Sequence, residues 1–223
     1  MLELACFTAS SAISAARAGA SRIELCASYS LGGVTPLLST LHSIRAETTI
    51  PIYIMIRPRG GNFTYSSPEF EAMKRSIQTF KASNAVDGFV FGILTEDARV
   101  DEVRNRELVL LAAPLPCTFH RAVDEVVDLV GAVEAVVACG FRSVLTSGGE
   151  GSAVEGVQRV AELQRRFGER VSLILGGGVR SSNVVGLKEG TRVEWVHSAA
   201  ITGSGEEVDE VEVRRMVALL RHV

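Results

Sequence analysis

The chain has 223 residues, 47% of them hydrophobic and 22% charged, a balance typical of a globular protein with a large core. Its net charge of −3 provides no basic surface, so we expect no nucleic-acid partner. No apolar run approaches the roughly 20 residues that cross a bilayer, so we expect no membrane partner. Only four cysteines occur in this large chain, which favours a reducing cytoplasm over a disulfide framework.

Short β-rich runs alternate with longer helical patterns along the whole chain. The helical stretch "PLLSTLHSIRAE" opens with Pro36 at a first-turn position, and "SPEFEAMKRSIQTFKAS" spaces its apolar residues by three or four. A later stretch, "EVVDLVGAVEAVVACG", repeats this spacing and ends at Gly140, with Asp124 expected as its N-cap. The predicted strands cover residues 2–6, 22–26, 52–56, 88–94, 117–121, 143–146, 171–175 and 193–197.

Eight β-then-α units imply parallel strands, because each helical crossover returns the chain in the same direction. An open doubly wound sheet and a closed barrel both fit this order. We favour the barrel, since the units are regular, no linker interrupts them, and "ACFTAS" after the first strand lacks the Rossmann glycines. The sequence therefore predicts a single domain over residues 1–223, a TIM-type (β/α)8 barrel with one or two abbreviated helices.

Polar residues gather where the predicted strands end, and in such a barrel these ends form the functional mouth. Alternation along each strand, and the cost of a charge beneath the helices, point Glu24, Arg57 and His120 into that mouth. We interpret these three as candidate catalytic residues. The alternatives are a buried Glu24–Arg57 ion pair and a core role for His120. Glu3 fits equally a buried partner for an arginine and a site residue.

Glycine-rich loops after the seventh and eighth strands, "LGGGVRSSN" and "HSAAITGSG", predict an anion site, because barrels frequently bind phosphate there. The loop "RPRGGNFTYSSPEF" is expected to be a lid or rim over the mouth, with an ordered structural loop as the alternative. The candidate anion-binding residues are Arg57, Arg59, Arg121, Ser147, Gly176, Gly177, Gly178 and His197.

Two cysteines, Cys6 and Cys26, end neighbouring strands and form a candidate metal site, because a pair of soft thiolates suits monovalent copper. Strict alternation from Glu3 places Cys6 on the opposite face, unless the strand ends or bulges first. Cys117 and Phe119 are expected to pack under the helices.

The runs "SRIELCASYSLGGVTPLLSTL", "IPIYIMIRPRGGNFTYSSPEFEAM", "CTFHRAVD", "VLTSGG" and "VEWVHSAA" together resemble the copper homeostasis protein family CutC. They match in order from the first predicted strand to the eighth. The resemblance implies a barrel of this type, a cytoplasmic location, self-association into a homo-oligomer and binding of Cu(I). It matches Cys6 and Cys26 to the positions that the family associates with copper, with His120 or His197 as additional ligands.

Two functions follow as hypotheses. The first, implied by the resemblance, is a copper homeostasis protein that binds Cu(I). The second is a barrel enzyme, or a sensor without chemistry, acting on a small phosphorylated or carboxylated metabolite. In that case Arg57 and Arg59 would clamp the anion, and His120 or Glu24 would exchange a proton with it.

Overall fold

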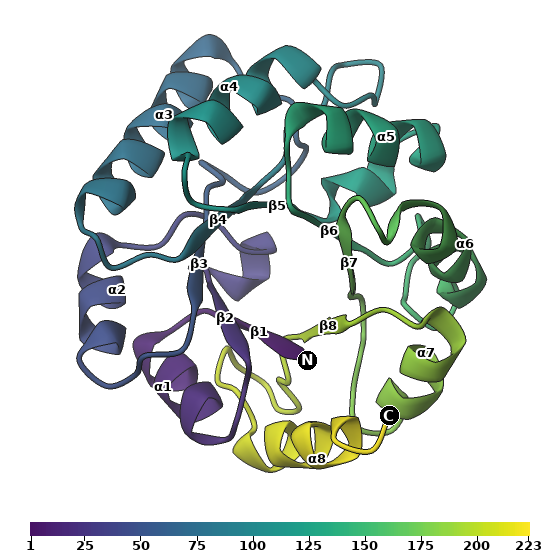
Figure 1. Cartoon of the computed structure of the whole chain (residues 1–223). Helices are drawn as coiled ribbons and strands as arrows, with labels where there is room; N and C mark the ends of the chain where they lie inside the picture. The colour runs from purple at the N-terminus through teal and green to yellow at the C-terminus, as the bar shows by residue number, and fades with distance from the viewer.

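Eight parallel strands close into a barrel, and eight helices form a ring around it (Figure 1). The computed structural model describes residues 1–223. The strands are β1 (Leu2–Cys6), β2 (Arg22–Leu25), β3 (Ile52–Met55), β4 (Gly88–Phe91), β5 (Cys117–Phe119), β6 (Ser143–Thr146), β7 (Ser172–Leu175) and β8 (Trp195–Ser198). The helices are α1 (Ala9–Arg17), α2 (Leu38–Arg45), α3 (Ser67–Ala82), α4 (Glu102–Ala112), α5 (Leu129–Cys139), α6 (Val157–Phe167), α7 (Val184–Thr191) and α8 (Glu210–Leu220).

The predicted TIM-type (β/α)8 barrel is confirmed, since every strand pairs in parallel with its sequence neighbour and β8 pairs with β1. Two of the helices, α2 and α7, have only 8 residues each, as the short chain led us to expect. Short 3-10 helices, η1 (Tyr29–Leu31) and η2 (Arg121–Glu125), follow β2 and β5. No helix of the chain combines the length and the apolar character that crossing a membrane requires.

Strands β2 and β3 end one residue earlier than predicted, β5 two and β4 three residues earlier. In β4 and β5, side chains and loops take over the hydrogen bonds. Beyond the end of β4, the Ile93 N–H donates to the Asn105 side chain and the Leu94 N–H to the Phe63 carbonyl. Strand β5 ends before His120, whose ring caps η2 by accepting the Ala122 N–H. Both strands end at the mouth, where the loops that follow them begin.

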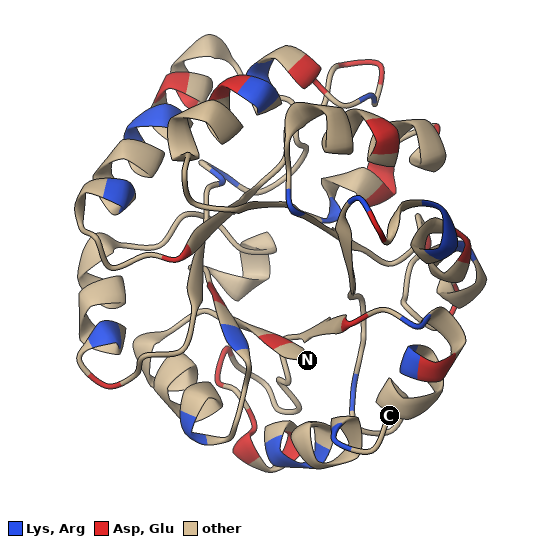
Figure 2. Ribbon diagram, in the orientation of Figure 1, with Lys and Arg blue, Asp and Glu red and all other residues tan.

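Alternation along the strands separates an apolar outer layer from a polar interior. Ile23 and Leu25 of β2 are fully buried in the 53-residue core between barrel and helices, whereas Glu24 faces inward. Inside the barrel the Thr118 and Ser143 hydroxyls lie 2.6 Å apart. The ring of helices carries acidic and basic residues on all sides (Figure 2), in keeping with the absence of a basic surface. The barrel interior thus holds polar side chains, whereas the layer between strands and helices is apolar.

The expected N-cap role of Asp124 is wrong. Helix α5 begins at Leu129, and Asp128 caps it by accepting the Gly131 N–H at 3.0 Å. Asp124 lies in η2, and three further residues, Val126 to Asp128, follow η2 before α5 starts. The Asp124 carboxylate is 7% exposed. Its partners are the Thr146 hydroxyl, the Ser147 N–H and hydroxyl, the Gly149 N–H and the Arg121 guanidinium. Asp124 therefore organises the loop after β6.

Because Asp124 and Asp128 have different roles, replacing them is expected to lower the stability of the protein by different amounts. Asp124→Ala is expected to lower the free energy of unfolding by about 3 kcal/mol, because several buried donors lose their acceptor. Asp128→Ala is expected to cost about 1 kcal/mol, the usual value of a helix cap. Asp97→Ala, an exposed control, should stay within about 0.5 kcal/mol of wild type in urea unfolding. Equal losses of unfolding free energy in Asp124→Ala and Asp128→Ala would contradict the assignment of Asp128 as the helix cap and Asp124 as the organiser of the loop after β6.

Candidate active site in the barrel mouth

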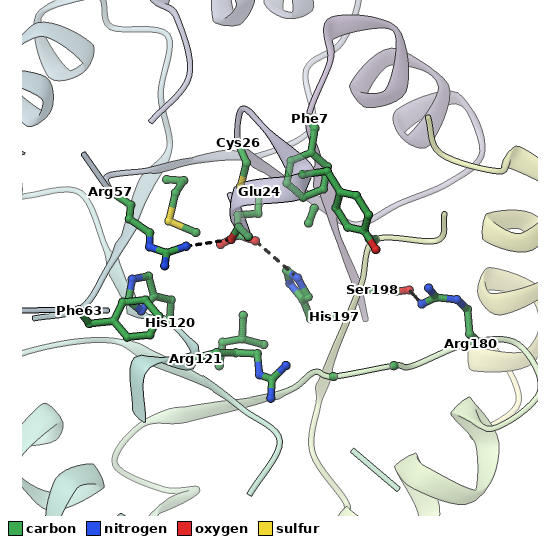
Figure 3. Close-up of a pocket in the computed structure, with 18 residues that line it drawn as sticks. Phe7, Glu24, Cys26, Arg57, Phe63, His120, Arg121, Arg180, His197 and Ser198 are labelled. Atoms are coloured by element: carbon green, nitrogen blue, oxygen red, sulfur yellow. Dashed lines mark hydrogen bonds and ion pairs between the residues drawn. The ribbon is translucent and has the colours of Figure 1, made fainter. Parts of the chain in front are cut away.

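One cavity of about 290 Å³ opens at the carboxyl ends of the strands (Figure 3). It lies where the fold predicts a functional site. The sequence-predicted residues that line it are Glu24, Cys26, Arg57, His120, Arg121, Gly177, Gly178 and His197. The cavity is also lined by Phe7, Tyr29, Phe63, Arg180 and Ser198.

His197 is held between two buried carboxylates. Its Nδ1 lies 2.7 Å from Glu3 Oε1, and its Nε2 lies 3.5 Å from Glu24 Oε2. Burial by itself would lower the pKa of His197, but the carboxylates of Glu24 and Glu3 outweigh burial and raise that pKa above its usual value. Glu3 also accepts a hydrogen bond from Arg22 Nε at 2.5 Å, so it is both an arginine partner and a neighbour of the site.

Glu24 is poised to take up or release a proton near neutral pH. Burial raises its pKa to about 7; the positive charge of His197 opposes this shift and the negative charge of Glu3 adds to it. Its Oε1 is buried and has no hydrogen-bond partner. The atoms of Glu3, Glu24 and His197 come within 4.8 Å of one another, close enough to hold a metal ion. The Arg22 charge bound to Glu3 opposes a cation there, so proton exchange is the chemistry that this cluster favours.

Arg57 does not pair with Glu24, which excludes the buried ion pair considered from the sequence. Its guanidinium donates instead to the carbonyl oxygens of Leu31, Gly33 and Gly61, at 3.1, 3.2 and 2.6 Å. A further contact of 3.3 Å joins it to the Gly32 carbonyl (Figure 3). These hydrogen bonds hold the loops after β2 and β3 together around the Arg57 guanidinium, whose positive charge no carboxylate neutralises.

His120 is a neutral hydrogen-bond donor. Burial, with the nearby Arg57 charge, lowers its pKa to about 3. Because Nδ1 accepts the Ala122 N–H at 3.2 Å, the single ring proton of the neutral form lies on Nε2. That Nε2 is buried and has no partner. The Phe63 ring packs against the His120 ring, and the two ring centroids lie 4.8 Å apart.

The loops after β7 and β8 present free donors to the cavity. The N–H groups of Gly177, Gly178 and Ala199 donate to no acceptor of the protein. A Cβ added at Gly178 would meet nothing within 4 Å, so its backbone is open to a ligand. Arg180 approaches from the same side and donates to the Ser198 hydroxyl at 3.0 Å (Figure 3).

Three candidate anion-binding residues lie outside the cavity walls. Arg59 is engaged with Glu69 at 2.6 Å and with carbonyl oxygens of its own loop. Ser147 is fully buried, with its hydroxyl between Asp124 and the Glu150 carbonyl. Gly176 lies inside the barrel, where an added Cβ would come within 2.7 Å of Leu145. The structure assigns these residues to the frame of the mouth.

Comparison with known proteins agrees with the resemblance of the sequence. The model of the CutC family matches residues 1–202. The human copper homeostasis protein cutC homolog is 41% identical over 200 residues, which cover 90% of this chain and 73% of that protein. A CutC family protein of Xanthomonas campestris pv. campestris is 37% identical over 237 residues, covering 99% and 98%. The crystal structure of the CutC protein from Streptococcus agalactiae superposes with a TM-score of 0.82 at 28% identity, covering 89% of this chain and 98% of that one.

The chain belongs to the CutC family.

In this CutC family member the two candidate copper ligands face opposite sides of the barrel wall. Cys6 is part of the core under the helices, whereas Cys26 lines the cavity and packs in an inner cluster with Met55 and Val90. This arrangement follows from strict alternation, because β1 does not bulge between Glu3 and Cys6. Burial raises the pKa of both thiols, and the Glu24 charge adds to the shift.

The sequence analysis of this CutC family member missed Arg180, Ala199 and the aromatic pair of Phe7 and Tyr29. Arg180 follows directly on the glycine triplet, so its position in "GGGVR" was an available signal. Phe7 and Tyr29 come from loops after β1 and β2, and their rings meet edge to face at 5.1 Å. No periodicity marks such loop residues, so only the folded chain could bring them together.

The buried neutral state of His120 predicts a pH dependence of stability. An unfolded histidine binds a proton below about pH 6.5, whereas folded His120 resists protonation down to about pH 3. Stability is therefore expected to fall by a few kcal/mol as the pH drops through this range. His120→Gln should lose less stability than wild type over the same range in urea unfolding. His42→Gln, an exposed control on α2, should follow wild type.

Proposed function

We propose that this CutC family member binds a small phosphorylated or carboxylated metabolite in the barrel mouth and exchanges a proton with it through Glu24. The observation that carries this proposal is the charge balance of the cavity. Arg57 and Arg180 line the cavity, and both donate only to carbonyl and hydroxyl oxygens. Arg121, by contrast, is neutralised by Asp124 at 2.8 Å.

Two uncompensated guanidinium groups in a partly buried cavity favour an anionic ligand. Removing a charge from water is costly unless an opposite charge accompanies it. A phosphate or carboxylate would supply that charge and accept charge-assisted hydrogen bonds. The free N–H groups of Gly177, Gly178 and Ala199 would add donors on the Arg180 side.

The proton-exchange part of the proposal is supported by the setting of Glu24. A carboxyl group with a pKa of about 7 is present in both protonation states at neutral pH, which is the condition for efficient general acid–base catalysis. The hydrogen bond between His197 and Glu3 keeps the His197 ring next to the Glu24 carboxylate. The apolar rings of Phe7 and Tyr29 provide a surface for the body of the ligand.

Copper binding is the second candidate function. It is favoured by the name of the family and by the sulfur atoms of side chains that line the barrel mouth. Cys26 and Met55 lie in one buried cluster that lines the cavity. Thiolate and thioether sulfur are ligands that Cu(I) prefers. We propose that a Cu(I) ion in the mouth would use Cys26 with Met55 rather than Cys26 with Cys6. His120 fits poorly as a third ligand, since its Nε2 carries the ring proton.

The proposed setting is the cytoplasm, because all four cysteines are free and a reducing compartment keeps them so. Self-association stays a prediction carried by the family resemblance. Exposed Val103 and Leu110, seven residues apart on α4, provide an apolar surface that suits it.

The anion site is tested by titration with inorganic phosphate and with 2-phosphoglycolate, monitored by calorimetry and thermal unfolding. Arg180→Gln is expected to weaken binding about 10- to 100-fold, the value of a lost charge-assisted contact. Arg75→Gln, an exposed control on α3, should bind as wild type does. Equal affinity of wild type and Arg180→Gln, or no binding of either probe, would overturn the proposal.

The copper candidate is tested with Cu(I) under anaerobic conditions, by competition against a chromophoric chelator. Cys26→Ser is expected to lower the affinity at least tenfold, and Met55→Leu to lower it less, because a thioether binds more weakly than a thiolate. Cys6→Ser, the matched control, should leave the affinity unchanged. Affinity should rise with pH, since the Cys26 thiol must lose its proton first. A loss in Cys6→Ser equal to that in Cys26→Ser would rule out this ligand set.

A further inference from the structure

Three buried polar atoms without any hydrogen-bond partner lie on side chains that line the same cavity. They are Glu24 Oε1, Arg57 Nε and His120 Nε2. The three residues are only 3%, 6% and 4% exposed, respectively. Buried polar atoms are normally paired, and leaving one unpaired costs on the order of 1 to 3 kcal/mol. A cavity that concentrates three of them is built to pair them with a ligand.

The three atoms have complementary chemistry. Arg57 Nε can only donate, and the other nitrogens of that guanidinium are already tied to loop carbonyls. His120 Nε2 is also a donor, because the backbone of Ala122 occupies the other ring nitrogen. The ionised Glu24 can only accept. Two fixed donors and one base are therefore carried by side chains that line one cavity.

Phe63 covers both donors. Its ring lies 4.6 Å from the Arg57 guanidinium carbon and 4.8 Å from the centre of the His120 ring (Figure 3). It belongs to the long loop between β3 and α3, which carries Gly60 and Gly61. A ligand oxygen that pairs with the two donors takes the place of the Phe63 ring. The loop would then act as a lid, whereas the sequence left open a lid, a rim or an ordered structural loop.

We propose that the mouth removes a proton from a carbon atom next to a carbonyl group. This inference rests on the proposed function and specifies its reaction. Glu24 takes the proton, the C–H electron pair forms the carbon–carbon double bond, and the carbonyl π electrons move to oxygen. Arg57 Nε–H and His120 Nε2–H donate to the resulting enolate oxygen. Return of the proton from Glu24 to the same carbon reverses these electron shifts and restores the carbonyl compound, so no oxidant, reductant or second substrate is needed.

The arrangement also defines the substrate class. A neutral imidazole and a guanidinium stabilise negative charge that develops on oxygen, which is the main demand of enolate chemistry. The anionic end of the substrate would lie against Arg180 and the free N–H groups of the β7 and β8 loops. The substrate is therefore a carbonyl compound with an adjacent C–H group and a phosphate or carboxylate at its far end.

Exchange of carbon-bound hydrogen with solvent tests this step before any product is known. The full chain is incubated in D2O with dihydroxyacetone phosphate, 2-oxoglutarate and acetoacetate, and proton NMR follows the loss of the signal next to the carbonyl. We expect at least one probe to exchange faster than with Glu24→Gln by 100-fold or more. His120→Phe should slow exchange about 100- to 1,000-fold, the effect of removing one such donor.

Matched variants separate a lost donor from a damaged fold. His120→Gln retains an N–H donor and should keep exchange within about tenfold of wild type, while His42→Phe should leave it unchanged. Thermal unfolding of each variant verifies that it is folded. If a variant fails to fold, Phe63→Ala takes its place in the comparison. This substitution should change the rate of hydrogen exchange and leave the affinity for phosphate within about twofold of wild type.

Two results would overturn the inference. One is exchange no faster with wild type than with Glu24→Gln for all three probes. The other is a His120→Phe variant that exchanges as fast as wild type. Phosphate binding that still depends on Arg180 would, in either case, leave the proposed anion site standing, so failure of the reaction and failure of the site are distinguishable.

Discussion

The buried Glu3 carboxylate is the interaction on which the site depends. It lies across from Arg22 and from His197 in the strand register, and it contacts both side chains. Arg22 is further held between the rings of Tyr53 and Trp195, at 4.2 and 4.1 Å. A carboxylate that is 1% exposed would be costly without these partners. By holding His197 beside Glu24, Glu3 links the closure of the barrel between β1, β2 and β8 to the chemistry of the mouth.

Hydrogen bonds give the mouth an ordered frame. Arg57 donates to four loop carbonyls, and Asp124 binds the loop after β6, so the donors around the cavity have fixed directions. Donors that are already oriented stabilise developing charge without reorganisation, which is the basis of electrostatic preorganisation. Under the proposed function, the loop that carries Phe63 is the element that would open.

The two candidate functions draw on different atoms of one cavity. Hard oxygen and nitrogen groups, Glu24, His120 and the arginines, suit an anionic metabolite, whereas Cys26 and Met55 suit a soft metal ion. Both sets face inward because alternation along β2 and β3 places Glu24, Cys26, Met55 and Arg57 on the same side of the wall. The inner face of these two strands therefore carries most of what distinguishes the mouth from an ordinary barrel core.

Much of the fold could be predicted from the sequence, because strand and helix periodicity is local information. The eight β-then-α units, the inward direction of Glu24, Arg57 and His120, and the outward packing of Cys117 and Phe119 all follow from period and alternation. Cys6 and Cys26 were a candidate metal pair, although strict alternation placed Cys6 on the face opposite Glu3; in the structure the two thiols lie on opposite sides of the barrel wall. The role of Asp124 was not predictable, since a carboxylate before a helix reads as a cap until its distant partners Thr146 and Ser147 are known.

The sequence by itself determined which residues face the interior and at which end of the barrel they gather. Only the tertiary structure decided their partners: that Arg57 binds carbonyls rather than Glu24, that Nδ1 of His120 is occupied, and that Arg180 joins the site. The physical reason is that hydrogen-bond pairing and charge balance depend on distances between segments far apart in the chain. Periodicity fixes the direction of a side chain, but only closure of the barrel fixes what that side chain meets.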